Sequence, residues 1–222
     1  MPLEAHERAR ARSDLYAALA LAFRKPEASS AGEEDRSLAD LLLQAAGRLD
    51  SALAALAEKA VDALRVDGGQ DEEALRTLEI EYNRLFFGPG RPLAPPYESL
   101  YRDGGGLVMG PSAQAVQACY AEAGFALAPD QRDLPDHVAA ELAFMACLAA
   151  EEAAAEGKEA MRWRERQDAF LGQHLAAWLP AFCQRVRSAA RHPFYLALAE
   201  LAEAFVEWDV ARRTPNRGAM DE

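Results

Sequence analysis

The sequence predicts an all-α fold, a single-domain helical bundle of about nine or ten helices, because apolar residues recur at helical spacing in segment after segment. Half of its 222 residues are hydrophobic, and alanine and leucine dominate, which is typical of helix-rich folded proteins. No alternating pattern is long enough to predict a strand, and no internal repeat has a fixed period. Residues 1–212 are therefore expected to form one domain, and residues 213–222 a disordered tail.

The first part of the chain is expected to be helical apart from short polar breaks. Leu15, Leu19 and Phe23 share one face of the first helix. Residues 35–66 are rich in leucine and alanine and predict one or two further helices, with Gly47 as the candidate joint. Residues 71–87 predict the next helix, whose acidic first turn suits the helix dipole. Its apolar stripe consists of Leu75, Leu78, Tyr82, Leu85 and Phe86.

A long loop is expected over residues 88–111. The stretch GPGRPLAPPYESLYRDGGGLVMGPS, residues 88–112, holds six glycines and five prolines between two segments of helical pattern. Long loops are uncommon in compact helical proteins, and those that occur are often functional. The loop is therefore a candidate for one side of a binding groove.

Four more helical segments are expected after the loop. Ser112 is the candidate N-cap of the first of them. A helix over residues 136–156 and another over 158–190 follow, and Pro180 should kink or split the second. Pro193 suits the first turn of the last helix, in which apolar residues again form a buried stripe.

The composition excludes several classes of function. The net charge is −12 and the isoelectric point is near 4.9, so the chain lacks the Lys/Arg excess that binding of nucleic acid requires. Such a protein attracts basic partners and repels anionic membranes. No apolar run has the length of a membrane span, and residues 1–14 do not resemble a signal peptide. We therefore expect a cytoplasmic protein without membrane insertion.

The three cysteines, Cys119, Cys147 and Cys183, are far apart and odd in number. Each lies in an apolar helical context, so we expect small buried residues of a reducing compartment rather than disulfides. The chain also lacks a phosphate-binding loop, a nucleophile elbow, paired cysteines and the histidine motifs of metal enzymes. We therefore expect no catalytic residues and no metal site.

One polar cluster stands out in the stretch PDHVAAE, residues 135–141. Asp136 and His137 lie where a loop becomes a helix, and Glu141 shares a helix face with His137. The structural interpretation is that Asp136 caps the helix and Glu141 pairs with His137 or a neighbouring helix. The functional interpretation is a polar binding site at the start of the helix.

The helix end before the loop, EYNRLFFG, and the aromatic loop segment, PPYESLY, also allow two interpretations. As structure, the helix end is core and the loop segment is a rigid lid packed on the bundle. As function, the two segments line a groove for an apolar peptide with basic flanks.

Several motifs in a fixed order resemble the TorD/DmsD family of redox-enzyme maturation chaperones. They are EYNRLFFGPG, APPYESLY, VMGPS, PDHVAAELAFMACL and HPFYLALAELAEAFVEWD, and the resemblance covers roughly residues 72–208, most of the chain. The resemblance implies an all-helical cytoplasmic chaperone that is not an enzyme. Members of the family bind the twin-arginine signal peptide of a molybdenum- or tungsten-cofactor oxidoreductase, hold the apoenzyme until the cofactor is inserted, and delay export until then.

The resemblance also implies a state of assembly, a cofactor content and a set of site residues. Some members form domain-swapped dimers, so a monomer and a swapped dimer both stay open. The client carries the cofactor, and none is expected here, although weak guanine-nucleotide binding is suggested for some members. The client-binding surface carried over by position consists of Tyr82, Leu85 and Phe86 at the helix end, Pro96, Tyr97 and Glu98 in the loop, and Asp136, His137 and Glu141 at the later helix start.

Two alternatives come from other classes of function. The first is a small-molecule or nucleotide-binding enzyme that uses Asp136, His137 and Glu141, since histidine is suited to proton transfer. No nucleophile or phosphate-binding segment accompanies these residues in the sequence. The second alternative is a helical scaffold that binds partners without regard to their leaders. The identity of the client oxidoreductase is left open.

Overall fold

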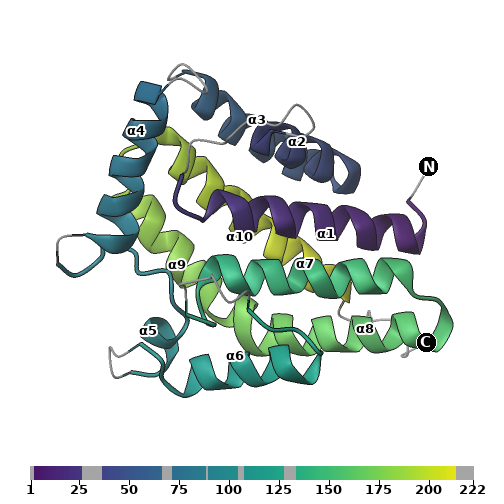
Figure 1. Cartoon of the computed structure of the whole chain (residues 1–222). Helices are drawn as coiled ribbons and strands as arrows, with labels where there is room; N and C mark the ends of the chain where they lie inside the picture. Colours follow the sequence, from purple (N-terminus) through teal and green to yellow (C-terminus); the bar gives the residue numbers. More distant parts are fainter. Residues whose placement is uncertain are drawn as a thin grey trace, which may run out of the picture.

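The computed structural model describes residues 3–26, 37–66, 72–88, 90–104, 108–127 and 134–213. All regular structure in these ranges is helical, and it comprises ten α-helices and two π-helical segments (Figure 1). Extended pairing in the same ranges is limited to an isolated bridge between Tyr97 and His137. The all-α expectation is confirmed.

The helical elements of the described ranges have a simple order along the chain. They are α1 (Ala5–Ala22), α2 (Leu38–Leu49), α3 (Ser51–Val66), α4 (Glu72–Tyr82), η1 (Asn83–Phe87), α5 (Ser99–Arg102), α6 (Pro111–Glu122), α7 (Val138–Ala154), α8 (Gly157–Phe170), η2 (Leu171–Leu175), α9 (Ala176–Ala189) and α10 (Pro193–Arg213).

The first helix lies at the centre of the bundle. It packs most extensively against α7 and also against α2, while α10 contacts α3 and α9. In Figure 1, α2 and α3 lie on one side of α1, and α6 and α8 lie beyond α7 on the other. Helices distant in sequence therefore meet in the middle of the protein.

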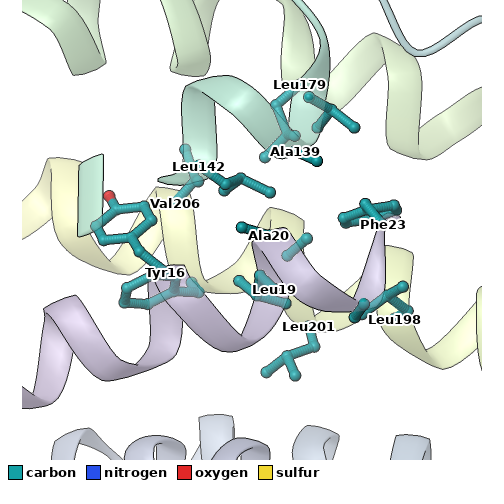
Figure 2. Close-up of a cluster of buried hydrophobic side chains, with 14 of the residues drawn as sticks. Tyr16, Leu19, Ala20, Phe23, Ala139, Leu142, Leu179, Leu198, Leu201 and Val206 are labelled. Atoms are coloured by element: carbon teal, nitrogen blue, oxygen red, sulfur yellow. The ribbon is translucent and has the colours of Figure 1, made fainter. Parts of the chain in front are cut away.

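Figure 2 shows the apolar contacts at this centre. A helix that is apolar on most of its faces must be covered from several directions, and α1 and α7 are covered in this way. The labelled side chains are Tyr16, Leu19 and Ala20 from α1, Phe23 at its C-cap, Ala139 and Leu142 from α7, Leu179 from α9, and Leu198, Leu201 and Val206 from α10.

The joint between the second and third helices differs from the expected one. Gly47 lies within α2, and the break falls at Asp50. The Asp50 carboxylate accepts a hydrogen bond from the Ala52 amide at 2.9 Å and another from Trp208 Nε1 at 3.1 Å. The joint lies at Asp50 rather than at Gly47 because the aspartate caps α3 and also bonds Trp208 of α10.

Pro180 does not split its helix at the proline itself. It lies inside α9, and the departure from α-helical geometry is the π-helical segment η2, which ends immediately before α9. Proline has no amide hydrogen for the carbonyl four residues earlier. That carbonyl belongs to the first residue of α9, so the backbone adjusts in the turn before the proline.

The Gly/Pro-rich segment contains a short helix, α5, that the loop expectation did not include. Ser112 is not the N-cap of α6, because Gly110 is the cap and Pro111 takes the first helical position. The Ser112 amide donates instead to Asp103 Oδ2 at 3.1 Å, and its hydroxyl also bonds this carboxylate. A Cβ at Gly110 would lie 2.2 Å from Asp103 Oδ2, so this close approach requires glycine.

The three cysteines have different environments, and no disulfide joins them. Cys183 is buried as expected, but Cys119 is half-buried and Cys147 is exposed. Among the described helices, none combines the length and the apolar character needed to cross a lipid bilayer. The expected tail falls on Arg213, which ends α10, and on residues 214–222, which lie outside the described residues.

Candidate functional site

The loop motif and the Asp-His motif lie side by side in the structure. The bridge between Tyr97 and His137 joins them, and their rings meet edge to face at 5.3 Å between centroids. The Val138 amide donates to the Pro96 carbonyl at 2.8 Å, and the Glu98 amide donates to the Asp136 carbonyl at 3.0 Å. Six of the nine residues predicted for the client-binding surface therefore form one continuous cluster, and one of the six is Glu141, which lies one turn along α7.

The two residues of the Asp-His motif have roles that the sequence did not assign. His137 caps α7, since its Nδ1 accepts a hydrogen bond from the Ala139 amide at 3.1 Å. Asp136 does not cap α7, which corrects the structural interpretation above. Its Oδ2 accepts from the Ser99 amide at 2.9 Å, so it stabilises the start of α5 instead. Both side chains are fully buried.

Glu141 is fully buried and bonds to a neighbouring helix, as one form of the structural interpretation expected. Trp178 Nε1 on α9 donates to Glu141 Oε2 at 3.0 Å. Burial, followed by the nearby negative charge of Glu98, raises the pKa of Glu141 well above its ordinary value. This shift favours the protonated, uncharged form of the Glu141 carboxyl.

The Glu98 carboxylate is fully buried and has two side-chain partners, a histidine and an arginine. His174 Nδ1 lies 3.0 Å from Glu98 Oε2, and Arg102 Nη1 bonds Glu98 Oε1. Arg102 also donates to the Gln173 carbonyl at 2.6 Å, and its side chain stays 38% exposed. The arginine thus neutralises the buried carboxylate from the solvent side.

An open groove of about 450 Å³ lies directly outside this pair. The π-helical segment η2 contributes to its wall, and π-helical turns are frequent at functional sites. The lining residues are Arg102, Pro111, Ser112, Ala115, Gly172, Gln173 and His174. Two of these lining side chains, Arg102 and His174, bond Glu98, which lies behind them.

The third part of the predicted surface, at the end of α4, lies elsewhere. Tyr82, Leu85 and Phe86 are at most 3% exposed and belong to the hydrophobic core. The Phe86 ring packs against Phe182 at 5.9 Å between centroids. In this conformation these three side chains present no surface to a ligand, and their direct contact with one would require the helix end to move.

Sequence reasoning did not identify Arg102, His174 and Phe87 as members of the site. Arg102 follows Glu98 by four residues, and that spacing could have indicated the pair. His174 lies far away in the sequence, and no local signal connects it with Glu98. Phe87 lies off the apolar stripe and is 53% exposed, unlike its neighbour Phe86.

The chemistry of the cluster is that of recognition through charge and hydrogen bonds. Asp136, His137 and Glu141 are closed to solvent, so they cannot reach a substrate in this conformation. Within the described ranges, no group of three or more His, Cys, Asp or Glu side chains is arranged to hold a metal ion. Glu98 is equally buried, and it is separated from the groove by the side chains of Arg102 and His174.

The sequence matches the profile of a family described as nitrate reductase delta subunit over residues 44–184. This match covers more than half of the chain.

Curated proteins with similar sequences are named as chaperones. The chain is 34% identical over 142 residues to the chaperone protein TorD of Vibrio cholerae serotype O1, with 62% of this chain and 63% of that protein covered. It is 37% identical over 138 residues to the selenate reductase assembly chaperone protein of Thauera selenatis, with 58% and 68% covered. For the Tat proofreading chaperone DmsD of Salmonella typhi the identity is 30% over 133 residues, with 60% of each chain covered. The match spans less than two thirds of the length of the TorD and DmsD proteins.

The fold is similar to the crystal structure of a protein described as a redox enzyme maturation protein from Archaeoglobus fulgidus. The TM-score is 0.53 at 18% identity, with 88% of this chain and 92% of that chain covered. The family profile, the named relatives and this fold agree with the motifs in the sequence. The chain therefore belongs to the TorD/DmsD family of redox-enzyme maturation chaperones.

Proposed function

We propose that this protein is a cytoplasmic chaperone for a molybdenum- or tungsten-cofactor oxidoreductase. It binds the twin-arginine leader and the apo form of its client, assists cofactor insertion, and delays export until the client has folded. Its relatives are named TorD, DmsD and selenate reductase assembly chaperone, which supports the client class. The net charge of −12 favours encounter with a basic leader.

The observation that carries this proposal is the buried Glu98 carboxylate behind the groove. Arg102 already shows how a guanidinium binds there, with one contact to Glu98 and one to the Gln173 carbonyl. An arginine of the leader can make the same two contacts when Arg102 moves aside. Charge-assisted hydrogen bonds of this kind are stronger than neutral ones, and arginine fits a carboxylate better than lysine does.

The apolar stretch of the leader needs an exposed apolar contact as well. Phe87 and Leu93, at the end of η1 and in the segment after it, are 53% and 47% exposed. Exposed large apolar side chains on neighbouring segments are typical of peptide-binding surfaces. We assign the apolar contact to these two residues, with Leu85 and Phe86 as the packed support behind them.

Calorimetric titration with a synthetic leader peptide tests the charged contact. The variant Glu98→Gln should bind a twin-arginine peptide about tenfold more weakly, because it loses one charge-assisted interaction. Glu203→Gln is the matched control, since Glu203 is also ion-paired, with Arg187. A peptide with two lysines should bind the unchanged protein more weakly, and Glu98→Gln should add little to that loss.

Equal affinity of Glu98→Gln and Glu203→Gln for the twin-arginine peptide would contradict the assignment of Glu98. Phe87→Ala tests the apolar contact with the leader without affecting folding, because an exposed ring contributes little to the stability of the core. It should weaken binding of the leader without changing the free energy of unfolding. Met161→Ala, which truncates an exposed side chain on α8, is its control.

The client can be identified by affinity capture of the tagged protein from its native host, followed by mass spectrometry. The expected partner is an oxidoreductase precursor that still carries its leader. Capture of mature enzyme without a leader would favour the leader-independent scaffold.

A further inference from the structure

A cysteine faces the histidine that Glu98 orients. Cys119 Sγ on α6 lies 3.8 Å from His174 Nε2, and Nδ1 of the same ring lies 3.0 Å from Glu98 Oε2. Cys119 is half-buried, whereas Glu98 and His174 are buried. The three residues come from separate segments of the chain, so only the tertiary fold brings this thiol, imidazole and carboxylate into one line.

The distances suit two ligands of a single metal ion. Zinc binds thiolate sulfur at about 2.3 Å and imidazole nitrogen at about 2.0–2.1 Å, which at a tetrahedral angle separates the two ligand atoms by about 3.6 Å. The observed separation of 3.8 Å requires only a small adjustment. A carboxylate on the other ring nitrogen is the usual support of a metal-binding histidine, and Glu98 has that position.

The electrostatic surroundings argue against a nucleophilic thiol. Burial, together with the negative charges of Glu122 and Glu98, raises the pKa of the Cys119 thiol. The thiolate is both the nucleophilic and the metal-binding form of cysteine, so this shift disfavours either use in the absence of a bound cation. The same negative charges favour a bound cation, whose charge compensates the thiolate that forms when the metal displaces the thiol proton.

We propose that Cys119 Sγ and His174 Nε2 form a two-ligand site for a borderline or soft transition-metal cation such as Zn²⁺. Water completes the coordination, because no third His, Cys, Asp or Glu ligand is in place among the described residues. Binding is therefore reversible and weaker than in a closed four-ligand structural site. His174 also lines the groove, so the site borders the surface proposed for the leader.

Titration of the purified, reduced full chain with Co²⁺ tests this site. Cobalt is the probe because a cobalt–thiolate bond produces a near-ultraviolet charge-transfer band, which Zn²⁺ then abolishes by displacing the cobalt. The unchanged protein and Cys147→Ser should show the band, and Cys119→Ser should not. Cys147 is the control because it is the exposed cysteine, on a different helix, α7.

Two further variants should weaken cobalt binding to different extents. His174→Gln should weaken cobalt binding at least tenfold because it removes a ligand, and circular dichroism establishes that the variant is folded. Glu122→Gln should weaken binding only a few-fold, because it removes a neighbouring charge and no ligand. Loss of the band in Cys119→Ser alone supports the site even where His174→Gln does not fold.

Three results would overturn the proposal. They are a band that persists in Cys119→Ser, a band that disappears in Cys147→Ser, and the absence of any band in the unchanged protein. The assay contains no client or leader peptide, so its outcome is independent of the proposed chaperone function.

Discussion

Two buried polar clusters of this protein differ in how their carboxyl groups are neutralised. In the first, Arg12 on α1 contacts Glu152 on α7 and Asp209 on α10, with Nη1 of the arginine 3.3 Å from Asp209 Oδ1. Tyr16 and Arg213 also donate to Asp209, each at 2.8 Å. In the second, the carboxyl groups of Glu98, Asp136 and Glu141 are all buried, and Arg102 at the edge of the groove pairs with Glu98.

The pKa values reflect this difference. In the first cluster, burial raises the pKa of Asp209 to about 6, and the opposing effect of Arg12 limits the shift. In the second cluster, the neighbours of Glu141 are other acids, so their charge adds to the effect of burial and the pKa rises well above its ordinary value. The first cluster therefore ties three helices together. The second keeps acidic groups beside a groove, where Glu98 is paired with the partly exposed Arg102.

The largest expected effect comes from breaking the first cluster. Arg12→Ala leaves Glu152 and Asp209 buried without this guanidinium, and the free energy of unfolding should fall by about 3–5 kcal/mol. Urea denaturation followed by circular dichroism measures the change. Arg10→Ala removes an exposed pair with Asp14 on the same helix and should cost less than about 1 kcal/mol.

A loss for Arg12→Ala as small as that for Arg10→Ala would show that water reaches the first cluster. Leader binding by the folded fraction of Arg12→Ala should stay unchanged, because the groove lies at the other cluster. A parallel loss of binding would mean that the two clusters are coupled.

The pH dependence of stability tests the shifted carboxyl of Asp209. Its pKa is about 6 in the folded protein, above the ordinary value of 3.8. Between these pH values the folded chain holds a proton that the unfolded chain has released. The contribution of Asp209 to stability is thus present below about pH 4 and is lost as pH rises to about 6, by at most about 3 kcal/mol.

Urea denaturation of the unchanged protein and of Asp209→Asn at pH 4, 5, 6 and 7 measures this contribution. The difference in slope between the two proteins across this range is the expected signal, since asparagine does not titrate. Parallel slopes would show that Asp209 is ionised in the folded state throughout the range.

An effect of opposite sign, a gain in stability, is expected from Glu141→Gln in the second cluster. The raised pKa favours the protonated form of Glu141, and glutamine has nearly the same shape and still accepts from Trp178 Nε1. The variant should match the unchanged protein at low pH and become the more stable of the two as pH rises, because the folded protein holds a proton that the unfolded chain loses.

Thermal unfolding at several pH values measures this difference. Glu151→Gln, at an exposed position on the same helix, should show no such trend. A Glu141→Gln variant that is less stable than the unchanged protein at neutral pH would mean that Glu141 is ionised, and that the second cluster carries more negative charge than we infer.

Local patterns predicted most of the helices, because the apolar spacing that produces an amphipathic helix is visible in a few turns of sequence. The helix containing Leu15, Leu19 and Phe23 and the one beginning at Pro193 are examples. The joint between the second and third helices was predicted at Gly47 but lies at Asp50, and the π-helical turn before Pro180 was not predicted. The position of the first depends on a contact with a distant segment, the bond from Trp208 to Asp50.

The sequence by itself determined the helical class, the acidic charge and the motifs that indicate the family, since these are properties of composition and local order. Only the tertiary structure decided what each site residue contacts. It buried Leu85 and Phe86 in the core, exposed Phe87, and brought His174 to Glu98 across 76 positions of sequence. Helix packing sets these distances, and no pattern within a single helix encodes them.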